Sequence, residues 1–123
     1  PTPAPTPTAA SGQNEERLLN MTALRERFAE DEIKMLFGIV EDSLGGELKK
    51  LREGLAQNDD KVVASVAHAF KGASMSIEAT TLYELLYELE KAAKASDSAS
   101  FAGLAEKIEV AFTETIEVIR RYK

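Results

Sequence analysis

Apolar and polar residues follow a helical period over most of the chain. Beyond residue 17, leucine, isoleucine, valine, phenylalanine and alanine recur every three or four residues, and no proline interrupts them. This spacing places the apolar side chains on one face of an α-helix. It predicts a short helix over about residues 22–28 and a long helix over about residues 31–56. The apolar stripe of the long helix consists of Ile33, Leu36, Val40, Leu44, Leu48, Leu51 and Leu55.

Three more helices are predicted beyond the long one, separated by short polar breaks. The run Asn58-Asp59-Asp60 offers N-cap residues for a helix that ends near Ser76. Another helix covers about residues 79–95, and residues 96–98 cap a last helix that continues to the chain end. Because short connections favour antiparallel neighbours, we predict an all-α fold. The expected arrangement is an antiparallel up-down four-helix bundle with a short additional N-terminal helix.

The N-terminal segment differs sharply in composition from the rest. Residues 1–17 contain all four prolines of the chain, together with threonine and alanine, and residues 1–16 hold no apolar side chain larger than alanine. Proline at alternate positions removes backbone donors and favours an extended spacer. We therefore interpret residues 1–17 as an interdomain linker and residues 18–123 as the folded domain, and we expect the chain to be part of a longer protein.

The composition excludes several classes of function. With 15 basic and 21 acidic residues the net charge is -6, which argues against binding nucleic acid or an anionic membrane through charge. No apolar run approaches the roughly 20 residues of a membrane-spanning helix. The absence of cysteine fits a reducing cytoplasm. A glycine-rich phosphate loop is also missing, and one histidine cannot supply a pair of imidazole ligands, so we expect no ATP site, metal or other cofactor.

The single histidine is the best candidate for chemistry. A helical projection places His68 opposite the apolar residues Val63, Val66, Phe70, Ala73 and Ile77. On its own, a lone exposed histidine is most often incidental. Here its neighbours along the helix are Ala64, Lys71, Gly72 and Met75.

These neighbours suit an exposed reactive ring. Lys71 lies one turn along, near water, where an ammonium group can meet negative charge attached to the imidazole. Gly72 costs about 1 kcal/mol in mid-helix relative to alanine, a cost that makes sense where another protein must approach closely. We therefore predict that Ala64, Gly72 and Met75 line a partner-docking surface.

The run His68-x-x-Lys71-Gly72-x-Ser74 resembles the signature of histidine-containing phosphotransfer (HPt) domains. It is followed by Ala79-x-x-Leu82 and Leu89-Glu90, as in that family. The similarity covers roughly residues 20–123. One departure is Glu78, where members of the family usually carry glycine or another small residue; this affects the expected turn and leaves the phosphoacceptor in place.

The resemblance implies a phosphorelay intermediate in two-component signalling. His68 would accept a phosphoryl group on Nε2 from an aspartate of a receiver domain and pass it to the aspartate of another response regulator. Lys71 would offset the phosphoryl charge, the other ring nitrogen would be held by a hydrogen bond or water, and Mg²⁺ would belong to the receiver. The expected partners are receiver domains of response regulators and of a hybrid kinase, and the expected state is a monomer.

Several settings and one different function remain open at this point. The linker favours the C-terminal module of a bacterial hybrid sensor histidine kinase. We expect the module itself to be cytoplasmic, and an inner-membrane sensor kinase is one candidate for its parent protein. A free-standing HPt protein and the phosphoacceptor domain of a chemotaxis-type kinase use the same chemistry. A degenerate HPt domain would instead be a helical interaction module without phosphoryl transfer. The retention of His68, Lys71 and Gly72 together argues against degeneration.

Overall fold

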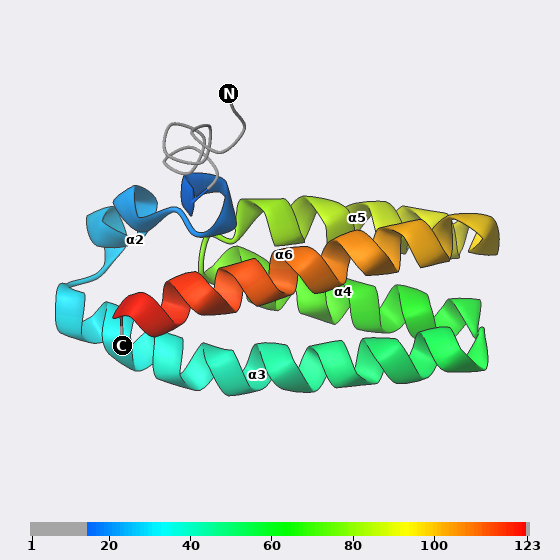
Figure 1. Ribbon diagram of the computed structural model, residues 1–123, viewed down its shortest axis with the longest axis horizontal. Helices are drawn as coiled ribbons and strands as arrows, with labels where there is room; N and C mark the ends of the chain where they lie inside the picture. Colours follow the sequence, from blue (N-terminus) through cyan, green and yellow to red (C-terminus); the bar gives the residue numbers. More distant parts are fainter. Residues whose placement is uncertain (1–14, 123) are drawn as a thin grey trace, which may run out of the picture.

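The computed structural model describes residues 15–122, which form helices joined by short turns. The helices are α2 (Met21–Arg27), α3 (Glu30–Gln57), α4 (Asp60–Ser76), α5 (Thr80–Lys94) and α6 (Phe101–Tyr122), with a 3-10 turn, η1 (Ser98–Ser100), before α6. The four long helices run alternately up and down beside one another, and α2 lies across one end (Figure 1). The predicted all-α four-helix bundle with a short additional helix is confirmed.

Local hydrogen bonds explain why the helices begin and end where they do. The Asp59 carboxylate accepts hydrogen bonds from the backbone N–H groups of Lys61 and Val62 and so caps α4. Glu32 caps α3 by accepting from the Ala29 N–H at 2.8 Å. The expected caps of the last helix act differently, because η1 intervenes and the Ser100 hydroxyl donates to Asp97.

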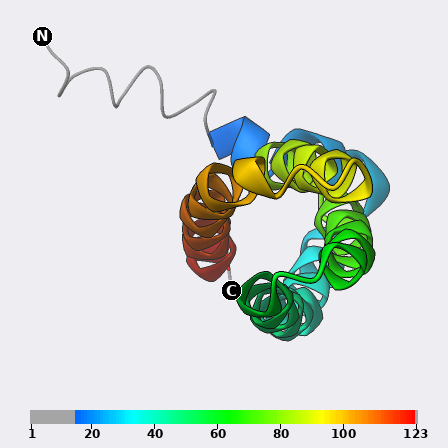
Figure 2. The same ribbon diagram turned by 90° about the vertical axis from the view of Figure 1, so that its right-hand side faces the viewer.

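The four long helices surround a common axis (Figure 2), and their buried apolar residues form one core cluster. Phe70 of α4 meets Phe112 of α6 edge to face, with ring centroids 6.3 Å apart. Phe37 of α3 is fully buried and meets Tyr122 in the same way at 6.4 Å. Such aromatic pairs join helices that are distant in sequence. These pairs join α6 to α4 and to α3, while α4 and α5 pack extensively side by side and so position the site described below.

The described part of the chain begins three residues before the predicted domain boundary. Residues 15–18 are helical, and within this turn Arg17 forms an ion pair with Glu84 of α5 and Glu15 pairs with Arg121 of α6. Residues 15–17 of the predicted linker therefore contact the bundle, whereas residues 1–14 lie outside the described residues.

Candidate functional site

His68 lies in the middle of α4, on the side of the helix that faces away from the core. Its side chain is 70% exposed, which confirms the predicted outward orientation. The buried face of α4 differs slightly from the prediction, because Ala67 and Ser74 are buried whereas Val66 and Ala73 are only partly buried. The helix is thus rotated so that small residues pack closely on the neighbouring helices, and His68 is left at the edge facing α5.

Buried Glu90 of α5 contacts the imidazole ring of His68 on the side that faces the protein interior. Its carboxylate is 5% exposed, and Oε2 lies 3.0 Å from His68 Nδ1. The Lys94 ammonium contacts the same oxygen at 2.9 Å, and the Lys71 ammonium lies 2.8 Å from Oε1. The close contact with the Lys71 ammonium offsets the burial of Oε1. One buried carboxylate therefore joins three groups from two helices.

The charged neighbours decide the protonation of Glu90. Burial alone would raise its pKa, but contacts with Lys71, Lys94 and His68 outweigh burial and lower the pKa from 4.5 to about 2. The carboxylate is consequently ionised near neutral pH, where both of its oxygens act only as hydrogen-bond acceptors.

An ionised Glu90 selects one tautomer of the neutral histidine. Because the carboxylate has no proton to give, Nδ1 must donate to it, and the ring lone pair is then on Nε2. Nε2 is the nitrogen that Glu90 does not contact. The site therefore presents a nucleophilic nitrogen on an exposed ring whose orientation is fixed from inside.

Lys71 is more enclosed than the sequence suggested. Its side chain is only 17% exposed, although we expected it to stand near water. The ammonium lies 5.1 Å from the ring centroid of Tyr87 and 6.0 Å from that of Tyr83, whose rings stack on each other. The hydrogen bond and charge of Glu90 raise the pKa of Lys71. Lys71 is thus a cation held between a carboxylate and aromatic faces.

The predicted docking residues lie in two different places. Ala64 helps to line a shallow depression of about 320 Å³ that also contains His68. Met75 is 57% exposed and borders a smaller depression of about 170 Å³, farther along α4. Gly72 lies between them on the exposed face, and a Cβ added there would meet no other atom within 4 Å. Small side chains along α4 therefore leave the surface on both sides of His68 open to a partner protein.

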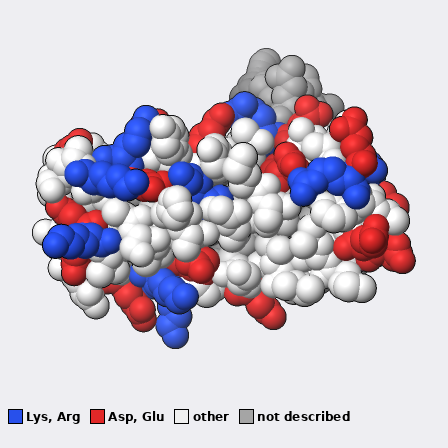
Figure 3. Space-filling model, turned by 180° about the vertical axis from the view of Figure 1, so that it is seen from behind, with Lys and Arg blue, Asp and Glu red and all other residues white. Residues whose placement is uncertain are grey.

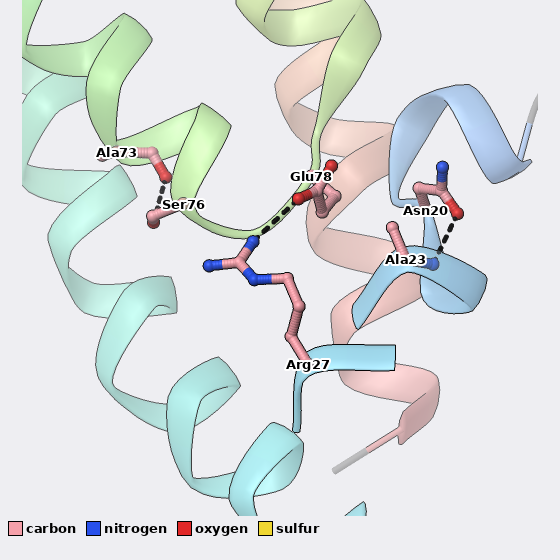
Figure 4. A network of polar contacts seen from close by, with 6 residues as sticks. All are labelled: Asn20, Ala23, Arg27, Ala73, Ser76 and Glu78. Carbon is pink, nitrogen blue, oxygen red and sulfur yellow. Dashed lines mark hydrogen bonds and ion pairs between the residues drawn. The ribbon is translucent and has the colours of Figure 1, made fainter. Parts of the chain in front are cut away.

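Glu78, the departure from the family pattern, lies in the turn between α4 and α5. Its φ of 60° explains why glycine suits this position. The carboxylate instead pairs with Arg27 at 2.8 Å, and the Glu78 carbonyl accepts a hydrogen bond from the Asn20 N–H. Figure 4 shows the Arg27–Glu78 pair beside the Asn20 side chain, which caps α2 by accepting from the Ala23 N–H. Glu78 therefore links the turn between α4 and α5 to α2 through its ion pair with Arg27.

Residues 15–122 contain neither a metal-binding cluster nor a membrane-spanning helix. This part of the chain has no group of three or more His, Asp or Glu side chains arranged to hold a metal ion. None of its helices is both long and apolar enough to cross a membrane.

Sequence reasoning noted Glu90 as part of a pattern but gave it no role, and it did not single out Lys94. The signal for Glu90 was its position on the apolar stripe of α5, in register with Leu86 and Ala93, which are both buried. A carboxylate at an inward position requires partners. Lys94, one turn along the same helix, was a candidate partner on spacing alone.

Comparison with known proteins agrees with this geometry. The family model described as "Hpt domain" matches residues 35–121, which is most of the chain and includes His68, Lys71 and Glu90. The chain belongs to the Hpt family. A search of curated proteins gave no match.

A solved structure supports the same assignment for the fold. This Hpt domain is similar to the crystal structure of histidine-containing phosphotransfer protein B (HptB) from Pseudomonas aeruginosa PAO1, with a TM-score of 0.74 and 26% sequence identity. The match covers 81% of this chain and 86% of the Pseudomonas chain. As an Hpt domain, the protein is a phosphotransfer module of two-component signalling.

Proposed function

We propose that His68 accepts a phosphoryl group from an aspartyl phosphate of a receiver domain and passes it to an aspartate of another response regulator. The observation that carries this proposal is the contact between His68 Nδ1 and buried Glu90, with the ring itself 70% exposed. A nucleophile for a protein-bound phosphate has to be accessible, and it needs a free lone pair. Nε2 meets both requirements.

The transfer step balances without a further reactant. The Nε2 lone pair attacks phosphorus, an N–P bond forms, and the P–O bond of the acyl phosphate breaks. The aspartate carboxylate leaves with the electron pair. The Nδ1 proton stays on the ring, which becomes positively charged. The Glu90 carboxylate, in contact with Nδ1, stabilises that charge. Donation to the next receiver is the reverse of this step.

Lys71 and the receiver's Mg²⁺ complete the proposed site by offsetting negative charge. The Lys71 ammonium lies beside the site and offsets negative charge on the phosphoryl group. In this proposal Mg²⁺ comes with the receiver domain, so the Hpt domain contributes only its own side chains. In this proposal the domain acts as a monomer in a cytoplasmic phosphorelay.

The docking surface in this proposal follows α4 from Ala64 past Gly72 to Met75. Small or uncharged side chains at these positions let a receiver approach His68 closely. Figure 3, which shows the molecule from behind the view of Figure 1, has charged side chains toward both ends of this face and a broad uncharged area between them. Such a face suits the centre of a protein interface, where charged residues are depleted.

The test is labelling of His68 by receiver domains charged with radiolabelled acetyl phosphate and Mg²⁺. The wild-type domain should acquire an acid-labile, base-stable label, and His68→Gln should acquire none while keeping its helicity and unfolding midpoint. Glutamine is similar in size to histidine but has no nucleophilic nitrogen. A folded His68→Gln variant that still takes up the label would overturn the assignment. A wild-type domain that binds receivers without labelling would identify an interaction module instead.

A further inference from the structure

Glu90 holds two ammonium groups that differ in their surroundings. Lys71 contacts Oε1 and Lys94 contacts Oε2. The Lys71 side chain is 17% exposed and packed against two tyrosine rings, whereas the Lys94 side chain is 67% exposed. Lys94 is therefore the more easily displaced of the two, because its ammonium is on the solvent side of the carboxylate and Lys71 remains to compensate buried Glu90 when Lys94 moves away.

Lys94 also contacts the same carboxylate oxygen as the imidazole, whereas Lys71 contacts the other one. Its ammonium shares Oε2 with His68 Nδ1, so the two nitrogens meet at one oxygen atom. The depression beside His68 is lined by Ala64, Ser65, His68, Glu90 and Lys94. Lys71 does not line it. The small side chains of Ala64 and Ser65 leave this space open next to the ring.

We propose that Lys94 is the ammonium that directly contacts the phosphoryl group on His68, while Lys71 stays paired with Glu90. This inference rests on the proposed function and assigns its direct charge contact to a residue of α5. On phosphorylation, Lys94 leaves Glu90 Oε2 for a phosphoryl oxygen. Glu90 keeps Lys71 and the protonated Nδ1, so its buried charge remains compensated.

The exchange is favourable because the phosphoryl group carries more negative charge than a carboxylate and offers three acceptor oxygens. The long, flexible lysine side chain can follow the new charge without a movement of α5. Lys71 has less freedom, because leaving Glu90 would uncover an uncompensated buried oxygen and break its contacts with Tyr87 and Tyr83.

The first experiment follows the two ammonium groups directly. The domain, labelled with ¹⁵N-lysine, is phosphorylated with phosphoramidate, a small donor that needs no receiver. The side-chain ¹⁵N shifts are read through the ε protons before and after phosphorylation, and the variants Lys94→Ala and Lys71→Ala assign the two resonances. The Lys94 resonance should move and the Lys71 resonance should stay. A shift of Lys71 alone, or of neither, would overturn the inference.

The second experiment measures the rate of His68 labelling by phosphoramidate. Lys94→Ala should lower the rate about fivefold, and Lys94→Arg should recover most of it because the charge returns. Lys91→Ala is the matched control, since Lys91 is half exposed on the same helix and pairs with Glu88. Equal rates for Lys94→Ala and Lys91→Ala would reject the inference. If phosphorylated receiver domains do not label the wild-type domain on His68, the proposed function itself fails, so the two failures are distinguishable.

Discussion

At the scale of single residues, the site depends on how one buried carboxylate is shared. Glu90 orients His68 through Nδ1 and is compensated by two lysines. Its partners therefore contribute to the fold as well as to the chemistry. Loss of a residue that compensates Glu90 should therefore lower stability as well as the rate of transfer. Loss of a residue that acts only on the phosphoryl group should change transfer alone.

Substitution of Lys71 should affect both properties. Lys71→Ala removes the charge nearest to Oε1 and the contact with Tyr87, so the unfolding temperature should fall, and transfer from a receiver to His68 should slow by roughly tenfold. Lys71→Arg should recover part of both losses, since it restores charge with a different reach. Circular dichroism and labelling rates at low and high salt provide the measurement. A Lys71→Ala variant as stable as Lys91→Ala would mean that Lys71 does not stabilise buried Glu90.

At the scale of elements, α4 combines a packed face with an unusually low outer face. Gly72 lies on that outer face with open space around it. Gly72→Arg should therefore leave the free energy of unfolding unchanged or raise it by up to about 1 kcal/mol, because arginine has the higher helix propensity. Labelling by charged receivers should drop strongly because the side chain blocks docking beside His68.

The matched control for this substitution is Gly103→Arg on α6, where an added side chain also meets no atom within 4 Å. It should cause no loss of transfer, and because Gly103 lies in the first turn of α6 its gain in helix stability should be smaller than that of Gly72→Arg. If Gly72→Arg labels as fast as Gly103→Arg with receivers, the glycine is not needed for access to His68.

The turn between α4 and α5 offers another element-scale prediction. Glu78→Gly should be more stable than Glu78→Gln by about 1 kcal/mol, because both lose the ion pair with Arg27 but only glycine relieves the left-handed backbone. The difference should persist in 1 M salt, whereas the advantage of wild type over Glu78→Gln should shrink as the ion pair is screened. Urea unfolding of the three proteins at both salt concentrations tests this. Equal stabilities for the glycine and glutamine variants would show that the backbone is not strained.

At the scale of the whole molecule, the sequence predicted the fold well because its signals are local. Helical periodicity and the Asp59 cap were sufficient for the element order and for bounds within a few residues. The rotation of α4 was less accessible, because Ala67 and Ser74 are weakly apolar in a projection and are buried only where helices approach closely. His68 could be recognised from its own helix. Lys94 could not, because its proximity to His68 depends on the packing of α5 against α4.

The stability of the whole domain should report the charge of Glu90. Since its folded pKa is about 2 and the ordinary value is 4.5, the unfolded chain binds a proton first as the pH falls. The ionised carboxylate therefore contributes stability that is fully present above about pH 5 and is lost progressively between pH 4.5 and 2. Glu90→Gln should be less stable than wild type by roughly 3 kcal/mol at pH 7, since the pKa of Glu90 is lowered from 4.5 to about 2 and each pKa unit corresponds to about 1.4 kcal/mol, and this difference should shrink steadily below pH 4.5. Urea unfolding from pH 7 to 2.5 measures it, with Glu88→Gln as the exposed control on the same helix. A difference independent of pH would mean that Glu90 stabilises the bundle through shape and not through its charge.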